Sequence, residues 1–201
     1  MKTEKDLTVI IVLYDSTEII FDCLRNLSYF QIIIVDNGKN KKILHQLRNF
    51  KNIIKVVTKY KNIGFGNAIN YAYSFVNTDY FLVLNPDVII KKDSIMELLN
   101  ISINDKDCAI SAPYIFTDKD SYGALPEKGK GILRNNDQEK ISEKLIDLKP
   151  SGAFCVDVTK GCAMLINSKH FKNIGMFSRE YFLFWEEIDL CRKFLKKKLS
   201  V

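Results

Sequence analysis

The stretch LTVIIVLYDS, residues 7–16, decides the fold, because seven strand-forming residues run without a break and end on polar side chains. A run this continuous is typical of a strand that is buried on both faces of a sheet. Similar runs recur at residues 31–35, 53–58 and 80–84, and the segments between them, 19–27, 43–47 and 68–76, carry apolar residues at helical spacing. The alternation predicts an α/β fold, a Rossmann-like, mostly parallel sheet with helices on both faces, whose ligands bind at the carboxyl ends of the strands.

The chain of 201 residues is long enough for one domain with a full core. The regular alternation covers residues 1–116. A polar, glycine-bearing stretch at 117–150 follows, and we interpret it as a mobile insertion with one amphipathic helix at 137–148. Residues 151–201 return to regular structure, with strands expected at 153–158 and 162–167, a short helix capped by Ser168, and a final helix at 186–197.

The composition, with 47% hydrophobic and 27% charged residues, predicts a globular protein rather than a disordered or fibrous one. No apolar run approaches the ~20 residues of a membrane span, and the first residues lack the pattern of a secretory signal, so we expect a cytoplasmic protein. The five cysteines form no CxxC pair, which fits neither a disulfide framework nor a zinc site. We interpret them as buried, reduced thiols.

The net charge of +6 is uneven, because residues 168–201 hold eight basic against four acidic side chains. A basic end suits an anionic membrane surface or a nucleic acid, although a solvated helix face explains it equally well. Nucleic acid is disfavoured because no zinc-finger, RNP or basic-zipper pattern occurs. We therefore expect no nucleic-acid partner, and we keep peripheral contact with the inner membrane face as one interpretation of the basic C-terminus.

Polar side chains follow the predicted strands at the points where the strands end, at Tyr14, Asp36, Asn85 and Asp87. At that edge a carboxylate can accept hydrogen bonds from a base or ribose, or ligate a metal. Each residue alone also fits a turn or a cap, and for Asp36 the structural interpretation is the stronger one. Asp87 is presented rigidly behind Pro86, which suits Mg²⁺ or Mn²⁺ bound jointly with a diphosphate, although a turn at a strand end explains it equally.

Two further segments carry chemistry. Residues 62–67, NIGFGN, precede a helical run, so that their glycines allow close backbone approach and the helix start offers N–H groups to an anion; glycines before a helix are also common. Residues 181–190, YFLFWEEIDL, place three acids directly after aromatic residues. An aromatic wall would desolvate these carboxylates and raise a pKa toward the range of a general base, and core aromatics beside exposed acids are the alternative.

In combination these motifs resemble the family 2 glycosyltransferases with the GT-A fold. The blocks at residues 8–16, 35–37, 62–70 and 85–87 come in the order of that family. The blocks at 161–166, 175–177 and 182–190 are similar to its acceptor-side half, especially in rhamnosyltransferase-like members. The resemblance spans nearly the whole chain and implies a single GT-A domain, with a nucleotide-sugar-binding half at 1–116 and an acceptor-side half at 151–201.

The resemblance also implies roles for individual residues. Those expected to bind the donor nucleotide are Tyr14, Asp36, Asn62, Gly64 and Asn85. Asp87 is expected to ligate the divalent metal, Mn²⁺ or Mg²⁺, on the diphosphate, and Glu187 to be the catalytic base. Those expected on the acceptor side are Gly161, Trp185, Glu186 and Asp189. Glu187 stands where the family usually carries Asp, and Gly38 stands where Ser often follows; the extra methylene shifts the carboxylate by ~1.5 Å, and misplacement by ~1 Å can cost ~100-fold in rate.

The reaction so implied is an inverting transfer of a sugar from a nucleotide-diphosphate donor to a hydroxyl of a glycan or lipid-linked acceptor. One alternative is a catalytically weak or inactive nucleotide-sugar-binding protein of the same fold. A nucleotidyltransferase is disfavoured, because residues 15–18, DSTE, stand where a Gly-rich phosphate loop would be expected. Val201 follows Asp189 by barely a helix, whereas the family usually continues with segments that cover the diphosphate. We therefore expect this short form to bind nucleotide but to transfer sugar slowly or not at all on its own.

Overall fold

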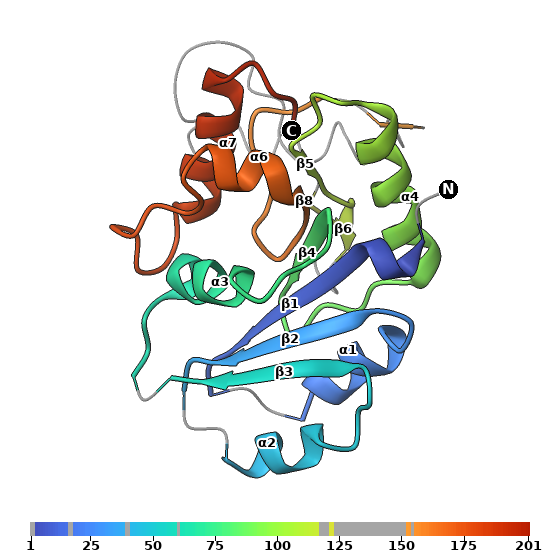
Figure 1. The fold of residues 1–201 in the computed structure, drawn as a ribbon, viewed down its shortest axis with the longest axis vertical. Helices are drawn as coiled ribbons and strands as arrows, with labels where there is room; N and C mark the ends of the chain where they lie inside the picture. Colours follow the sequence, from blue (N-terminus) through green and yellow to red (C-terminus); the bar gives the residue numbers. More distant parts are fainter. Residues whose placement is uncertain are drawn as a thin grey trace.

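A computed structural model describes residues 3–15, 18–38, 41–59, 61–116, 121–122, 152–153 and 155–201 (Figure 1). The strands are β1 (Leu7–Leu13), β2 (Gln31–Asp36), β3 (Ile53–Thr58), β4 (Tyr80–Leu84), β5 (Ile110–Ser111), β6 (Ile115–Phe116), β7 (Ser121–Tyr122) and β8 (Ala163–Asn167). The α-helices are α1 (Ile20–Asn26), α2 (Lys41–Leu47), α3 (Phe65–Tyr73), α4 (Lys92–Asn104), α6 (Ser168–Asn173) and α7 (Glu186–Lys196), and a short 3-10 helix spans Glu4–Asp6. The four strands and three helices expected in the first 84 residues are confirmed within a few residues at each end.

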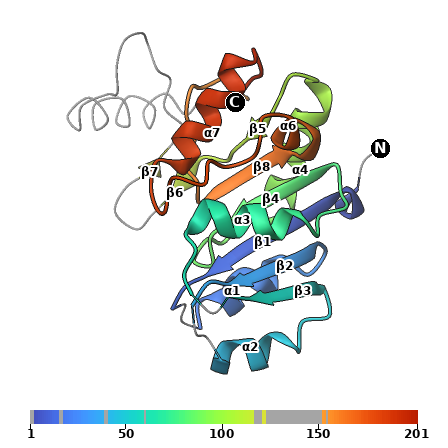
Figure 2. The ribbon, with the colours of Figure 1, turned by 60° about the vertical axis from the view of Figure 1, so that its left-hand side comes forward.

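The main sheet has six strands in the order β3-β2-β1-β4-β8-β5 (Figure 2). Strands β1 to β4 are parallel to one another, while β8 runs antiparallel to both of its neighbours, β4 and β5. All residues of the central strands β1 and β4 are buried, as their uninterrupted apolar runs predict. The expected α/β class with a mostly parallel sheet is therefore confirmed.

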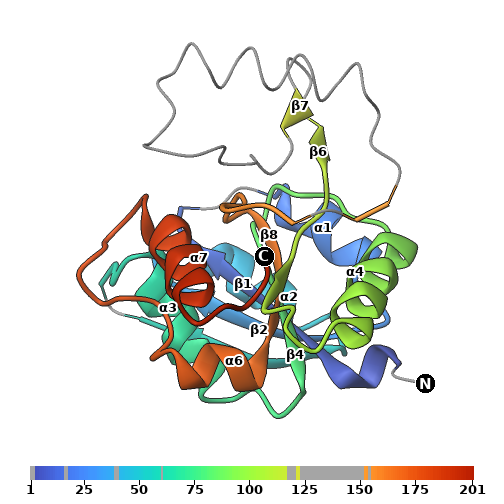
Figure 3. The ribbon, with the colours of Figure 1, turned by 90° about the horizontal axis from the view of Figure 1, so that it is seen from above.

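Helices cover both faces of the sheet (Figure 3). Alternate residues of each strand point to opposite faces, so each strand contributes to two cores. On β1, Val9 and Ile11 belong to one core cluster, whereas Ile10 and Val12 belong to the other. The first cluster includes the apolar residues of α1, α2 and α4, and the second includes those of α3, α6 and α7. The acceptor-side half thus shares its core with α3 and contributes two of the three helices on that face.

Several details of the second half differ from the expectations. The described residues of 153–158 form no strand; instead the Val156 N–H donates a hydrogen bond to the Val201 carbonyl at 2.9 Å. Ser168 is the first residue of α6 rather than its cap, because the Asn167 side chain accepts hydrogen bonds from the N–H groups of Lys169 and His170. The predicted helix at 137–148 and most of the insertion at 117–150 lie outside the described residues, and within that insertion Ser121–Tyr122 pairs with β6 as a short antiparallel ladder.

The cysteines are free thiols, as expected, but only three of the five are buried. Burial raises the pKa of both the Cys23 and the Cys191 thiol to about 12, so these two side chains behave as small apolar groups. Cys155 is exposed and Cys162 is half-buried, which corrects the expectation that all five lie in the core. No helix in the described ranges is both long and apolar enough to cross a membrane.

Candidate active site

The candidate site lies at the carboxyl edge of the parallel strands. In the sheet Leu13 is in register with Asp36, and Ile11 with Leu84, so that the residues following β1, β2 and β4 emerge at one edge. Tyr14 is 57% exposed there and Asp87 is also exposed, whereas Asp36 is 1% exposed. The sequence-predicted donor residues therefore share one edge, but Asp36 lies beneath its surface.

Asp36 and Asn37 shape the turn after β2. The Asp36 Oδ1 accepts a hydrogen bond from the Gly38 N–H at 3.2 Å, which is the local turn bond that favours Asp at this place. Asn37, which sequence reasoning did not single out, is 2% exposed and reaches the loop before α3. Its Nδ2 donates to the Asn62 Oδ1 at 2.6 Å, and its Oδ1 accepts from the Ile63 N–H at 3.0 Å. The sequence signal that could have identified Asn37 is its position, directly after an apolar strand and Asp36.

Gly64 is required by close packing of two backbones. Its φ of 86° and ψ of 164° lie in a region that is essentially reserved for glycine. A Cβ at this position would lie 2.3 Å from the Phe182 carbonyl oxygen, and the same oxygen accepts the Phe65 N–H at 3.1 Å. One of the N–H groups at the start of α3, expected to be open to an anion, is therefore bonded to the protein.

Asp87 and Glu187 approach the same end of the β4–β8 pair. The Asn85 N–H donates to the Cys162 carbonyl at 2.8 Å, which fixes the chain just before Asp87. Next to Cys162, Gly161 lies directly beside the Glu187 side chain, because a Cβ built on the glycine would be in ordinary contact with the Glu187 Cβ at 3.5 Å. Burial raises the pKa of the Cys162 thiol, and the Asp87 charge adds to this rise.

The acids at the start of α7 differ in their environments. Glu186 is 5% exposed, and its Oε2 has no hydrogen-bond partner among the described residues. Burial, and secondarily the charge of Glu187, raises the pKa of the Glu186 carboxyl. Residues Phe182 to Trp185 are 51–68% exposed, so they form neither the expected wall nor the alternative of core aromatics, whereas the expected rise in the pKa of a carboxyl is found at Glu186. The buried carboxyl is thus Glu186, and Glu187 is half-buried beside Gly161.

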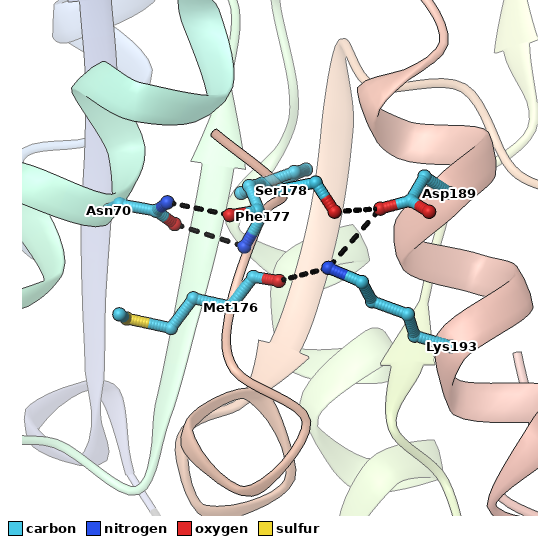
Figure 4. Close-up of polar contacts among 6 residues, drawn as sticks. All are labelled: Asn70, Met176, Phe177, Ser178, Asp189 and Lys193. Atoms are coloured by element: carbon cyan, nitrogen blue, oxygen red, sulfur yellow. Dashed lines mark hydrogen bonds and ion pairs between the residues drawn. The ribbon is translucent and has the colours of Figure 1, made fainter. Parts of the chain in front are cut away.

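Asp189 is engaged in holding the chain together (Figure 4). Its Oδ2 accepts a hydrogen bond from the Ser178 hydroxyl at 2.5 Å and lies 3.2 Å from the Lys193 Nζ. Lys193 in turn donates to the Met176 carbonyl at 3.1 Å. Asp189 thus connects α7 to the segment that precedes it. The sequence predicted Asp189 on the acceptor side but did not predict this structural role.

The sequence profile of "Glycosyl transferase family 2" matches residues 8–169, which is most of the chain. The chain belongs to glycosyltransferase family 2. It is 27% identical over 202 residues to the low-salt glycan biosynthesis hexosyltransferase Agl10 of Haloferax volcanii, covering 98% of this chain and 64% of the relative. It is 26% identical over 203 residues to the rhamnosyltransferase WbbL of Escherichia coli, covering 91% and 74%. The expected resemblance to rhamnosyltransferase-like members of family 2 is thereby confirmed.

Among solved structures, the mannosyltransferase PcManGT from Pyrobaculum calidifontis, in complex with GDP-Man and Mn²⁺, matches with a TM-score of 0.70 at 12% identity. The match covers 97% of this chain and 53% of that structure. Such a likeness establishes the GT-A fold of the family 2 domain. The chain spans between half and three quarters of the length of these relatives.

Within the described part of the chain, the metal site expected at Asp87 would have one exposed protein carboxylate rather than a cage of ligands. No cluster of three or more His, Cys, Asp or Glu side chains that could hold an ion occurs in the described part of the chain. Asp87 is exposed at the edge where β4 ends, with its backbone fixed from Asn85. One carboxylate fits a Mg²⁺- or Mn²⁺-type ion whose remaining ligands are diphosphate oxygens and water, since such ions are commonly bound by one or two protein carboxylates plus substrate.

Proposed function

We propose that this chain transfers a hexose or deoxyhexose from a nucleoside-diphosphate sugar to a hydroxyl of a glycan or lipid-linked acceptor, with inversion at the anomeric carbon. The observation that carries the proposal is the approach of Asp87 and Glu187 to one end of the β4–β8 pair. On this proposal Asp87 faces the diphosphate of the donor, and Glu187 faces the hydroxyl of the acceptor. The names of the relatives, a hexosyltransferase and a rhamnosyltransferase, support this donor class.

On this proposal the donor lies along the carboxyl edge of β1, β2 and β4. Tyr14 is exposed enough to contact a base, and Asp36 and Asn62 shape the turn and loop beneath it. Asn85 presents Asp87, which would hold a divalent ion; when bound, that ion offsets the negative charge of the leaving diphosphate. Gly64, expected near the nucleoside, contributes by letting the Phe182 backbone approach.

Glu187 is proposed as the base. Its carboxylate takes the proton of the acceptor hydroxyl as the hydroxyl oxygen bonds to the anomeric carbon, and the bond from that carbon to the diphosphate breaks on the opposite face. Gly161 lies beside it, and the exposed Trp185 offers an aromatic surface next to the acceptor position. An aromatic face of this kind can pack against a sugar ring.

The rival proposal, a domain that binds donor without transferring sugar, is favoured by one observation, the Glu at position 187 in place of the commoner Asp. We also propose that the exposed Lys196, Lys197 and Lys198 allow peripheral contact with an anionic membrane on the cytoplasmic side. Sedimentation with anionic and with neutral liposomes tests that contact separately from the chemistry.

The proposed donor site is tested by calorimetric titration of guanosine, uridine and thymidine diphosphates, each with and without Mn²⁺. We expect one of them to bind, and we expect Asp87→Asn to abolish the Mn²⁺-dependent gain in affinity while leaving the melting temperature within about 2 °C, because an exposed side chain contributes little to the core. Asp93→Asn, at an exposed acid in the first turn of α4, is the matched control. Binding that is independent of Mn²⁺ in the unmodified chain would remove Asp87 from the site.

A further inference from the structure

The inference concerns residues 176–185, which we name the pre-helical segment, and it rests on the proposed role of Glu187. Five non-glycine residues in the described chain have a positive φ, and three of them, Met176, Phe184 and Trp185, fall in this segment with φ of 65°, 67° and 71°. Such conformations are strained for residues with a Cβ and persist only where neighbouring groups enforce them. Something outside the segment must therefore hold it.

Helix α3 supplies the restraint. The Asn70 side chain brackets Phe177, with Nδ2 donating to the Phe177 carbonyl at 2.9 Å and Oδ1 accepting the Phe177 N–H at 3.1 Å (Figure 4). Closer to the helix start, the Asn67 Nδ2 donates to the Arg179 carbonyl at 3.3 Å, and the Phe65 N–H donates to the Phe182 carbonyl at 3.1 Å. Three positions along α3 thus hold three successive points of the segment by its backbone.

The restraint extends to the donor edge on one side and to α7 on the other. Gly64 lacks the Cβ that would clash with the Phe182 backbone, and the Asn37 Nδ2 donates to the Gly64 carbonyl at 3.3 Å. On the other side, Ser178 is bonded to Asp189 of α7, and the Trp185 carbonyl accepts the Asp189 N–H at 2.9 Å. Glu187 is the second residue of α7, so its position follows that of the segment.

We infer that Asn70 and Gly64 are positioning residues, which fix the pre-helical segment against α3 and thereby set the Glu187 carboxylate beside Gly161. Neither residue needs to touch the donor or the acceptor. Loss of either restraint lets the strained residues relax and displaces the start of α7. A displacement on the ~1 Å scale is enough to lower turnover by ~100-fold when it moves a general base.

The chain offers a matched control for Asn70. Asn52 is a half-buried asparagine that also makes two hydrogen bonds to backbone, donating to the Leu27 and Phe30 carbonyls at 2.9 and 3.0 Å. These bonds tie the end of α1 to the start of β3, away from the pre-helical segment. Asn70→Leu and Asn52→Leu therefore remove similar numbers of bonds in different places.

Trp185 is the only tryptophan of the chain, so intrinsic fluorescence reports on the pre-helical segment without any substrate. Both variants are expected to lower the melting temperature by a similar amount, roughly 2–10 °C. Only Asn70→Leu is expected to shift the Trp185 emission maximum and to increase acrylamide quenching. It is also expected to lower the rate of donor cleavage by at least about tenfold with unchanged affinity for the nucleoside diphosphate. Equal Trp185 emission and quenching in the two variants would overturn the inference.

A second pair keeps the test decisive if Asn70→Leu does not fold. Gly64→Ala brings a Cβ against the Phe182 carbonyl, whereas Gly175→Ala shares a positive φ, 83°, with nothing within 4 Å of the added atom. The Trp185 signal should change in Gly64→Ala alone, whatever the effect of the substitution on nucleoside-diphosphate affinity. Affinity lost together with an unchanged Trp185 signal would instead assign Gly64 to the nucleotide. If the proposed function fails because Glu187→Gln transfers normally, the fluorescence comparison still decides whether Asn70 and Gly64 hold the segment.

Discussion

The carboxyl edge of the sheet and the pre-helical segment flank the same candidate site, yet different forces hold them. The edge follows from strands such as β1 and β4, whose residues are all buried and whose register is fixed by parallel ladders. The segment buries few of its large side chains and has three residues in strained backbone conformations. It depends on single hydrogen bonds from α3 and α7. Donor binding should therefore withstand substitutions that abolish correct placement of the base.

The largest effect is expected for Glu187→Gln. Removal of a general base typically lowers turnover by about 10²–10⁴-fold, whereas the amide keeps the shape of the side chain beside Gly161. Donor affinity should change little, since the nucleotide is expected along the β1–β2–β4 edge. Turnover is measured as nucleoside diphosphate released in the presence of acceptor, and affinity by calorimetry. A variant that transfers sugar at a near-normal rate would show that Glu187 is not the base.

Glu187→Asp sharpens the same comparison between a fixed edge and an adjustable segment. If the pre-helical segment places the longer side chain correctly, shortening it by one methylene should lower turnover by roughly tenfold or more. If the site is relaxed and tolerant, turnover should be retained or should rise. The two results separate a tuned site from the catalytically weak alternative.

The next largest effect is expected on the free energy of unfolding, for a substitution in the buried strand β4. Phe81 in β4 is fully buried and packs its ring against Tyr73 and Phe171 at centroid distances of 5.3 and 5.0 Å. Phe81→Ala should therefore lower the free energy of unfolding by about 3–5 kcal/mol. Phe184→Ala, whose ring is 68% exposed, should change it by less than about 0.5 kcal/mol. Denaturant titration of both variants measures the contrast, and equal losses would contradict the division between edge and segment.

The sequence predicted the edge because buried parallel strands leave continuous apolar runs. Strands 7–13 and 80–84 have the observed bounds for that reason, whereas β3 at 53–58 is an edge strand with mostly exposed residues, which corrects the expectation of a strand buried on both faces. The restraints on the pre-helical segment could not be predicted in this way, because Asn70 and Phe177 are 107 residues apart and neither forms part of a periodic pattern. The exposure of residues Phe182 to Trp185 could not be predicted for a related reason. An aromatic run usually indicates burial, but here the backbone is held by hydrogen bonds from residues far away in the sequence, such as that from the Phe65 N–H to the Phe182 carbonyl.

A smaller effect is expected for Asp189→Asn. The carboxylate joins Ser178 and Lys193, and the ionic contact is partly exposed, with 25% and 27% of the two side chains accessible. Water screens such a pair, so we expect a loss of about 0.5–1.5 kcal/mol in the free energy of unfolding. Lys193→Met, which removes the same ionic contact from the other side, should give a similar loss, and the double variant should lose less than the sum. Strict additivity in this cycle would show that the two side chains do not interact.

The smallest expected effect is a pH dependence of stability that arises from Glu186. Burial and the neighbouring Glu187 charge raise the pKa of this carboxyl above its usual value, so the folded chain retains the proton at pH values where the unfolded chain has lost it. In that window the folded state binds more protons, and stability falls as the pH rises. Glu186→Gln removes this cost, so the variant should melt above the unmodified chain at pH 7 to 8. The difference should shrink as the pH is lowered and vanish near the ordinary pKa of glutamate.

Glu97→Gln, at an exposed position of α4, is the control and should show no such trend. A Glu186→Gln chain that melts below the unmodified chain throughout would mean that the ionised carboxylate is stabilised in the fold, and the buried acid would then be held by a favourable contact rather than tolerated at a cost.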